Sequence, residues 1–256
     1  IITMYLGGYP ENVLEFYKIK KKLKCFLIED ACHAFGAKYK SINKKVYIGS
    51  CKHSDISCFS LHPVKTITAG EGGILTTNNK YFSKKILLLR SHGMVRHKTD
   101  HWKYSVSDIG FNYRLSDINC SLALSQLNKI KKFISYRKKI NKNYVKSLNN
   151  FIKFPIYNKN NESAYHLFII SINFKKYKIT KDTFLRYFRK KNLFFQYHYI
   201  PIYKFKLFKK KNFILKGSET YFNNSLSIPI YYNLKFKSQK KIIDTIKNYL
   251  RTRISI

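Results

Sequence analysis

The chain has 256 residues, a formal net charge of +37, and a composition that is 45% hydrophobic and 16% aromatic. A chain of this length and composition can bury a sizeable core, which excludes the class of intrinsically disordered proteins. It contains no apolar run near the roughly 20 residues that span a bilayer, and no secretory signal pattern. We therefore expect a folded, enzyme-like cytoplasmic protein with no membrane partner.

Lysine accounts for nearly all of the positive charge. It supplies 42 of the 50 basic residues and arginine only 8. Proteins that read nucleic acids favour arginine, because its guanidinium group makes paired hydrogen bonds to phosphates and base edges. Alanine occurs only six times beside abundant Ile, Asn, Tyr and Phe, a joint bias expected of an A+T-rich genome. We expect no specific nucleic-acid partner, and solvated surfaces at the densest lysine runs, 18–24 and 204–216. A basic, non-catalytic binding protein stays open as the alternative.

The five cysteines predict neither a disulfide framework nor a metal centre. Their number is odd, and their spacing lacks CxxC and the other patterns typical of zinc ligands. Reduced thiols agree with a cytoplasmic location. The five are Cys25, Cys32, Cys51, Cys58 and Cys120.

Strands and helices alternate in the first third of the chain, which is typical of an α/β domain with a mostly parallel sheet. Ligands of such sheets lie beyond the carboxyl ends of the strands, where we expect Glu29 and Asp30 to emerge. The predicted strands cover residues 1–5, 25–28, 56–61 and 72–77, and the predicted helices residues 13–22 and 80–90.

Two helices, over 115–130 and 131–148, are expected to carry the chain into a smaller α+β domain. We therefore divide the chain into 1–130, part of a larger domain, and 131–256. In the second part we expect strands at 165–174 and 194–202, a helix begun by Thr180, and an irregular segment at 204–216. The last helix should bury one apolar face, formed by Ile242, Ile243, Ile246, Tyr249 and Leu250.

Two segments contain residues suited to chemistry. Asp30 stands among small residues at the end of a strand, and a carboxylate facing a pyridine nitrogen keeps that nitrogen protonated. Lys65 follows another strand, between hydroxyls and glycines, and a lysine amine can form a Schiff base with an aldehyde. From the residues alone, a helix N-cap at Asp30 and a surface charge at Lys65 stay open.

Six segments, in order along the chain, resemble the DegT/DnrJ/EryC1/StrS family of sugar aminotransferases. They read Glu-Asp-Ala-Cys-His-Ala (29–34), Phe-Ser-Leu-His-Pro-Val-Lys (59–65), Gly-Glu-Gly-Gly (70–73), Arg-Ser-His-Gly (90–93), Gly-Phe-Asn-Tyr-Arg-Leu-Ser-Asp (110–117) and Leu-Ser-Ile-Pro-Ile (226–230). The resemblance implies a fold-type-I, aspartate aminotransferase-like fold that binds pyridoxal 5'-phosphate as a homodimer in its full-length form.

The same resemblance assigns roles to individual residues. Lys65 is the implied Schiff-base lysine, Asp30 the partner of the ring nitrogen, and His33 a neighbour of the 3-hydroxyl. Ser60 and Asn112 match phosphate ligands, Asn112 from the other subunit. Ser60 as a plain strand end and His33 as a core histidine stay open. The residues implied near the substrate are His62, Glu71, Arg114 and His198; no metal is implied.

Within the family, the sequence around Lys65 resembles that of enzymes that aminate C4 of a UDP-4-keto-6-deoxy-N-acetylhexosamine on the way to pseudaminic acid. The resemblance implies L-glutamate as the amino donor. A lysine rather than a histidine at this position favours transamination over dehydration. Family members carry a longer N-terminal stretch with a phosphate-binding turn, so we expect a truncated chain. An inactive remnant of such an enzyme is the second alternative.

Overall fold

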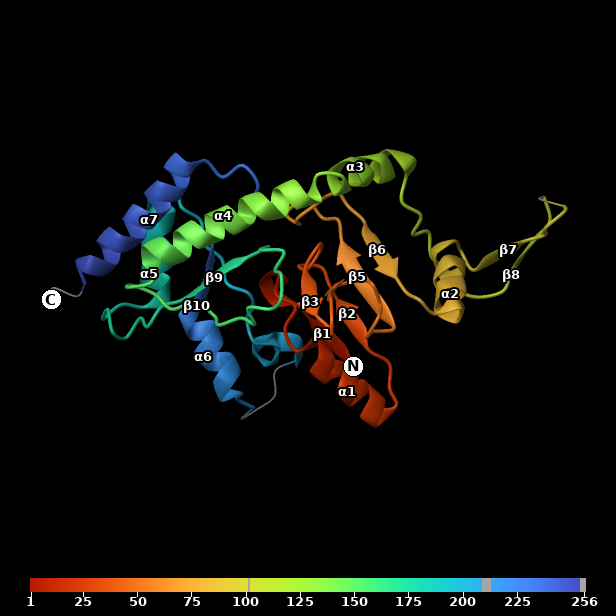
Figure 1. Ribbon diagram of the computed structural model, residues 1–256, viewed down its shortest axis with the longest axis horizontal. Coiled ribbons are helices and arrows are strands. Elements are labelled where there is room, and N and C mark those ends of the chain that lie inside the picture. Colours follow the sequence, from red (N-terminus) through yellow and green to blue (C-terminus); the bar gives the residue numbers. More distant parts are fainter. Residues whose placement is uncertain (101, 209–212, 254–256) are drawn as a thin grey trace. The chain divides into compact units, whose positions relative to one another are not determined.

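Two units of structure share the chain, which a computed structural model describes for residues 1–100, 102–208 and 213–253 (Figure 1). The first unit comprises Ile1–Lys131 with Asn158–Ala164, and the second comprises Lys132–Tyr157 with Tyr165–Ile256. No helix among the described residues combines the length and the apolar character needed to cross a membrane.

A four-stranded sheet forms the centre of the first unit, in the order β1-β2-β5-β6. β1 pairs with β2 and β2 with β5 in parallel, while β6 runs antiparallel to β5. The mostly parallel sheet expected from the sequence is thereby confirmed. The strands are β1 (Ile2–Met4), β2 (Ile28–Asp30), β5 (Ile56–Ser60) and β6 (Gly73–Thr76).

Helices α1 (Val13–Leu23) and α2 (Lys80–Arg90) of this unit confirm the sequence prediction, and a 3-10 turn η1 (Leu6–Gly8) precedes α1. The side chain of Asn79 caps α2 by accepting from the backbone N–H groups of Tyr81 and Phe82. These two bonds satisfy two of the backbone donors that every helix start leaves without a partner.

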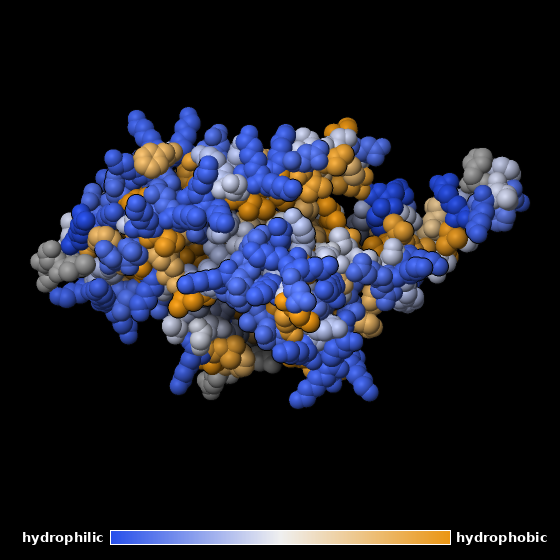
Figure 2. Space-filling view, viewed as in Figure 1, coloured by the Kyte–Doolittle hydropathy of each residue, from blue (hydrophilic) through white to orange (hydrophobic). Residues whose placement is uncertain are grey.

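Helix α3 (Asp117–Leu127) also confirms a predicted helix, but its apolar side chains are not buried. Ile118 is 83% exposed and Leu124 60% exposed. Figure 2 shows apolar side chains gathered over this helix, on a face that is otherwise mostly hydrophilic. The apolar spacing therefore predicted the helix, whereas no described segment covers its apolar side chains.

The strand predicted at 25–28 is shifted in the structure, which corrects our expectation for Glu29. β2 begins at Ile28, so that Glu29 lies inside the strand, only 3% exposed. Its carboxylate accepts hydrogen bonds from the hydroxyls of Tyr5, at 2.8 Å, and Ser57. A buried carboxylate needs such partners, and Glu29 is therefore part of the core rather than of a site.

Two short hairpins in the first unit were not predicted. They pair β3 (Lys38–Lys40) with β4 (Lys45–Tyr47) and β7 (Met94–Arg96) with β8 (Tyr104–Val106), both antiparallel. Each strand has three residues, which is too short for an alternating apolar pattern to appear.

The second unit packs helices against one antiparallel pair of strands, β9 (Phe168–Ser171) and β10 (Ser225–Ile228). Thr180 and Thr183 form a capping box at the start of α5, as the Thr180 cap predicts. The five apolar residues predicted for the face of the last helix are all buried. The helices are α4 (Ile130–Leu148), α5 (Lys181–Lys190), α6 (Lys216–Asn224) and α7 (Phe236–Arg251).

Two predictions for the second unit were wrong. No strand forms over 194–202: Gln196 makes an isolated bridge with Ser227, and Pro201, which has no N–H to donate, precedes the 3-10 turn η2 (Ile202–Lys204). The segment 204–216 is not wholly irregular, since it contains the 3-10 turn η3 (Lys206–Phe208) and the start of α6. Residues 209–212 of that segment lie outside the described residues.

Candidate functional site

Asp30 is the last residue of β2, the second strand of the sheet. In the parallel register it lies between Met4 of β1 and Cys58 of β5. Its Oδ1 accepts a hydrogen bond from the backbone N–H of Cys32 at 3.1 Å. The carboxylate is thus held at the carboxyl edge of the sheet by the turn that follows its own strand.

His33 is buried, with 3% of its surface exposed. Its Nδ1 accepts a long hydrogen bond, 3.4 Å, from the backbone N–H of Gly7. Gly7 has a φ of 71°, in the left-handed region that favours glycine. This contact fixes the ring of His33 against the turn that follows β1.

Lys65 lies in the turn between β5 and β6, which we name the lysine loop (residues 61–69). The carbonyl oxygen of Leu61 closes the loop by accepting from the N–H of Ala69 at 3.0 Å and from Oγ1 of Thr68 at 2.9 Å. Inside the loop the N–H of Lys65 donates to the carbonyl of His62 at 3.0 Å. Lys65 itself is half-buried. The loop is therefore an ordered turn that holds one lysine.

Ser60 and Glu71 flank the lysine loop. Ser60 ends β5 opposite Gly73, and its Oγ accepts from the N–H of His62 at 3.3 Å. The ring of His62 lies 3.7 Å from a carboxylate oxygen of Glu71, and both side chains are exposed. The two ends of the lysine loop therefore lie close together, with His62 in contact with both Ser60 and Glu71.

Asp30 and Lys65 both affect the pKa of one thiol, that of Cys32. Burial, followed by the hydrogen bond and the charge of Asp30, raises the pKa of the Cys32 thiol to about 11. The ammonium of Lys65 acts on the same thiol in the opposite direction. The charges of Asp30 and Lys65 therefore act on the same thiol with opposite sign.

Cys58 shares this environment. Its pKa is also raised, first by burial and then by the charge of Asp30. The Sγ of Cys32 lies 3.9 Å from the carbonyl oxygen of Cys58. Sequence reasoning gave neither thiol a place at the site, although Cys32 is two residues from Asp30 and Cys58 two residues from Ser60.

Asn119 is a further residue that sequence reasoning missed. From α3 its Nδ2 donates to the carbonyl oxygen of Ala69, the last residue of the lysine loop, at 2.5 Å. Its Oδ1 accepts from Oγ of Ser116 at 2.5 Å. The local signal was the N-cap at Ser116, three residues earlier, which brings Asn119 into the first turn of the helix.

The remaining predicted residues lie elsewhere. Asn112 bridges to Ser91 beside α2, and Arg114 lines a hollow on the same helix. Among the described residues, neither makes a hydrogen bond or ion pair with Lys65 or Asp30. His198 belongs to the second unit, where its Nδ1 lies 3.0 Å from Oγ of Ser227.

Within the described ranges, no group of three or more His, Cys, Asp or Glu side chains is arranged to hold a metal ion.

Comparison with known proteins gives a consistent result over nearly the whole chain. The model of the DegT/DnrJ/EryC1/StrS aminotransferase family matches residues 1–247. A UDP-4-amino-4,6-dideoxy-N-acetyl-beta-L-altrosamine transaminase of Campylobacter jejuni is 35% identical over 98% of this chain and 65% of its own length. A transaminase of the same name from Helicobacter pylori is 31% identical, over 96% of this chain and 64% of its own. The chain thus spans about two thirds of the length of these relatives.

Solved structures show the same fold. Helicobacter pylori PseC, an aminotransferase involved in the biosynthesis of pseudoaminic acid, has a TM-score of 0.87 and 29% identity over 98% of this chain and 67% of its own. The aminotransferase TlmJ from Streptoalloteichus hindustanus has a TM-score of 0.87 at 19% identity, over 98% of this chain and 65% of its own. The predicted α/β fold class of such transferases is confirmed.

Proposed function

Because this chain belongs to the DegT/DnrJ/EryC1/StrS aminotransferase family, we propose that it acts as a pyridoxal-phosphate-dependent nucleotide-sugar aminotransferase. The observation that carries the proposal is that Asp30 ends β2 and Lys65 follows β5, the parallel strand beside it, so that both residues leave the sheet at the same edge. The charges of both also act on the thiol of Cys32. A carboxylate at the end of one strand and an amine after the adjacent strand are the two groups that this cofactor chemistry requires.

The residues around Cys32 fit the cofactor. Asp30 offers a carboxylate for the ring nitrogen, Lys65 an amine for the aldehyde, and Ser60 a hydroxyl donor for the phosphate. Ala31 and Ala34 have no exposed surface. The turn after Asp30 is therefore closely packed and holds the carboxylate in a fixed position.

When bound, pyridoxal phosphate supplies an aldehyde and a ring that withdraws electrons from the reacting carbon. Asp30 would hold a proton on the ring nitrogen, since an ionised carboxylate favours the charged form of its partner. The Nζ of Lys65 would bind the aldehyde carbon and later carry a proton between carbon atoms as a general base and acid. His33 would hold the cofactor ring in position through the 3-hydroxyl group of that ring. Ser60 and Asn112 would bind the phosphate of the cofactor.

For the substrates we propose a UDP-4-keto-6-deoxy-N-acetylhexosamine as amino acceptor and L-glutamate as donor. Support for the acceptor comes from the names of the Campylobacter and Helicobacter transaminases, which match 98% and 96% of this chain. The donor is proposed from the sequence resemblance alone. The exposed pair His62 and Glu71 beside the lysine loop would contact the sugar, and we assign Arg114 and His198 to the same substrate.

We also propose that the enzyme is a homodimer. Asn112 stands in a segment whose neighbouring apolar side chains are exposed, Phe111 at 50% and Tyr113 at 69%. The two rings stack at 4.8 Å, and α3, which follows directly, is equally uncovered. Exposed apolar surface of this extent is typical of an interface with another chain.

The test of the function is covalent trapping at Lys65. With limiting pyridoxal phosphate, borohydride reduction and peptide mapping should place the label on Lys65, and Lys65→Ala should lose both the label and the cofactor absorbance. Lys52→Ala removes an exposed lysine of the same unit and should keep both. Preferential labelling of any other lysine would show that the assignment is wrong.

A further inference from the structure

A segment from the second half of the sequence belongs to the first unit. It comprises Asn158–Ala164, which follows α4 in the sequence and forms part of the same compact unit as Ile1–Lys131. We name this segment the strap. None of the residues assigned to the site from the sequence lies in it, so any effect of the strap on the site must act through its contacts.

Glu162 attaches the strap to β3. The backbone N–H of Glu162 donates to the carbonyl of Lys38 at 2.7 Å, and the N–H of Lys38 donates to that of Glu162 at 2.8 Å. The carboxylate of Glu162 lies 3.1 Å from Nζ of Lys38 and 2.6 Å from Nζ of Lys45. These contacts fix the strap at the residue before Ser163.

Ser163 and Ala164 bind the turn that follows β1, which we name the glycine turn (Leu6–Gly8). The carbonyl oxygen of Gly8 accepts from Oγ of Ser163 and from the N–H of Ala164, each at 2.9 Å. Gly7 and Gly8 have φ values of 71° and 90°, in the region that favours glycine. Two donors on one carbonyl fix the orientation of its peptide group, so the strap sets the direction of the glycine turn.

The glycine turn also holds His33. The N–H of Gly7 donates to Nδ1 of His33 at 3.4 Å, and the ring is buried. Ala164 belongs to the same buried apolar cluster as Ala34, the residue after His33. The strap and His33 thus bind one turn, through the neighbouring residues Gly8 and Gly7.

The bond from Gly7 decides where the neutral imidazole carries its proton. A ring nitrogen that accepts a hydrogen bond has no proton, and a backbone N–H is always a donor. The proton of His33 is therefore on Nε2, which can donate to an oxygen. Because a hydrogen bond to an ionised oxygen favours the ionised form, His33 in this tautomer would favour the ionised 3-hydroxyl of the proposed cofactor.

We propose that Ser163 is a positioning residue. It fixes the glycine turn through the carbonyl of Gly8, and the glycine turn fixes the tautomer of His33 that has its proton on Nε2. The role of His33 at the cofactor rests on the proposed function, whereas the tautomer is a property of the cofactor-free chain. Ser163 acts through the glycine turn rather than on a substrate.

Nitrogen-15 NMR of the cofactor-free chain with labelled histidine tests the proposal, at about pH 8, where an ordinary histidine is neutral. His33→Gln identifies the signals of His33. In the unchanged protein, Nε2 should be protonated and Nδ1 should not. In Ser163→Ala, both shifts should move toward the averaged values of a histidine in solution. Amide exchange at Gly7 should rise roughly fivefold, as expected for the loss of one hydrogen bond.

Ser163→Ala should fold, because the N–H of Ala164 still binds Gly8, and circular dichroism would verify this. Should it not fold, Ser163→Cys, whose thiol is a weaker donor in the same place, should shift the His33 signals in the same direction by less. Ser163→Thr keeps the hydroxyl and should retain the tautomer of the unchanged protein.

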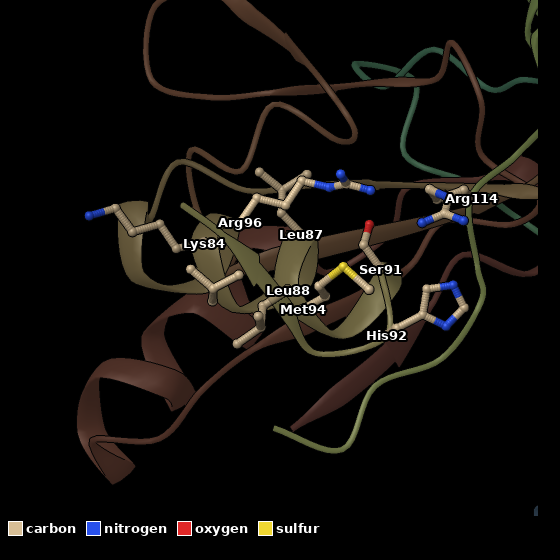
Figure 3. Close-up of a pocket in the computed structure, with 9 residues that line it drawn as sticks. Lys84, Leu87, Leu88, Ser91, His92, Met94, Arg96 and Arg114 are labelled. Carbon is tan, nitrogen blue, oxygen red and sulfur yellow. The ribbon is translucent and has the colours of Figure 1, made fainter. Parts of the chain in front are cut away.

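The control is Ser91→Ala, which removes another serine hydroxyl of the first unit, one that lines the hollow between α2 and β7 (Figure 3). It should leave the His33 shifts unchanged. Unchanged shifts in the Ser163 variants, or an equal change in Ser91→Ala, would overturn the proposal, as would a proton on Nδ1 in the unchanged protein. Lys65→Ala should give the shifts of the unchanged protein, so this test and covalent trapping at Lys65 can fail independently.

Discussion

Asn119 and Ala69 join the first turn of α3 to the end of the lysine loop, through a hydrogen bond of 2.5 Å from Nδ2 to the backbone carbonyl oxygen. Ala69 has no exposed surface, and its N–H closes the loop on Leu61. The loop that holds Lys65 is therefore anchored at its last residue by a side chain 50 residues away in the sequence.

We expect Asn119→Asp to loosen this loop while preserving α3. The carboxylate can still accept from Ser116, but it has no N–H to donate to Ala69. Loss of one such bond, about 1 kcal/mol, should raise amide exchange in residues 61–73 roughly fivefold. Hydrogen exchange with mass spectrometry measures this without cofactor. Ser125→Ala, which removes an exposed hydrogen bond from the same helix, is the control, and exchange that matches the control would argue against the anchor.

The alkylation rate of Cys32 reports on the two charges at the candidate site. Asp30 raises the pKa of this thiol and Lys65 lowers it. Since the thiolate is the reactive form, Asp30→Asn should speed alkylation near pH 9 and Lys65→Met should slow it. Peptide mapping of labelled protein gives the rates, with exposed Cys120 as the internal reference. A rate in Lys65→Met equal to that of the unchanged protein would mean that the amine does not reach Cys32.

Helices of this protein could be predicted from the sequence where one segment contains its own signals. Asn79 caps α2, and the helix runs over the predicted residues. The apolar spacing in α7 predicts a face that is buried at every position. The same spacing in α3 predicts the helix but not its environment, because burial depends on what covers the helix.

Contacts between distant segments could not be predicted. The sequence places Glu29 and Asp30 together at a strand end, yet only Asp30 lies at the edge. The hydroxyl of Tyr5, the residue after β1, holds the carboxylate of Glu29 in the core. The N-cap at Ser116 places Asn119 in the first turn of α3 but does not indicate its bond to Ala69. The resemblance indicated Asp30 and Lys65, whereas the effect of both on the thiol of Cys32 follows only from the three-dimensional structure.

Two glycine substitutions should have opposite effects on stability. Gly93→Ala forces a Cβ against the carbonyl of Asp108 at a positive φ, so the free energy of unfolding should fall by about 1 kcal/mol or more. Gly217→Ala places a Cβ in open space in the first turn of α6 and should raise it by roughly 0.5 kcal/mol. Urea denaturation measures both. A loss for Gly217→Ala would show that the structure of that turn differs from the one described.

Lys181 should make the stability of the second unit depend on pH. Burial lowers the pKa of this lysine to about 8. Its Nζ donates to the carbonyl of Phe222 and lies 4.3 Å from the centre of the Phe222 ring. In the unfolded chain the same amine has its ordinary pKa of 10.5. Between these values the unfolded state binds more protons, so the free energy of unfolding should rise with pH, and this contribution is lost as the pH falls through 8.

The measurement is urea denaturation of the unchanged protein and of Lys181→Met at several values from about pH 7.5 to 9.5, below the range in which tyrosines titrate. The stability of the unchanged protein should increase relative to that of Lys181→Met as the pH rises, because methionine carries no titrating amine. Lys175→Met replaces an exposed lysine before α5. Its free energy of unfolding should change with pH as that of the unchanged protein does. If the free energy of unfolding of Lys181→Met changes with pH in the same way, Lys181 keeps its proton over this range and burial does not govern its charge.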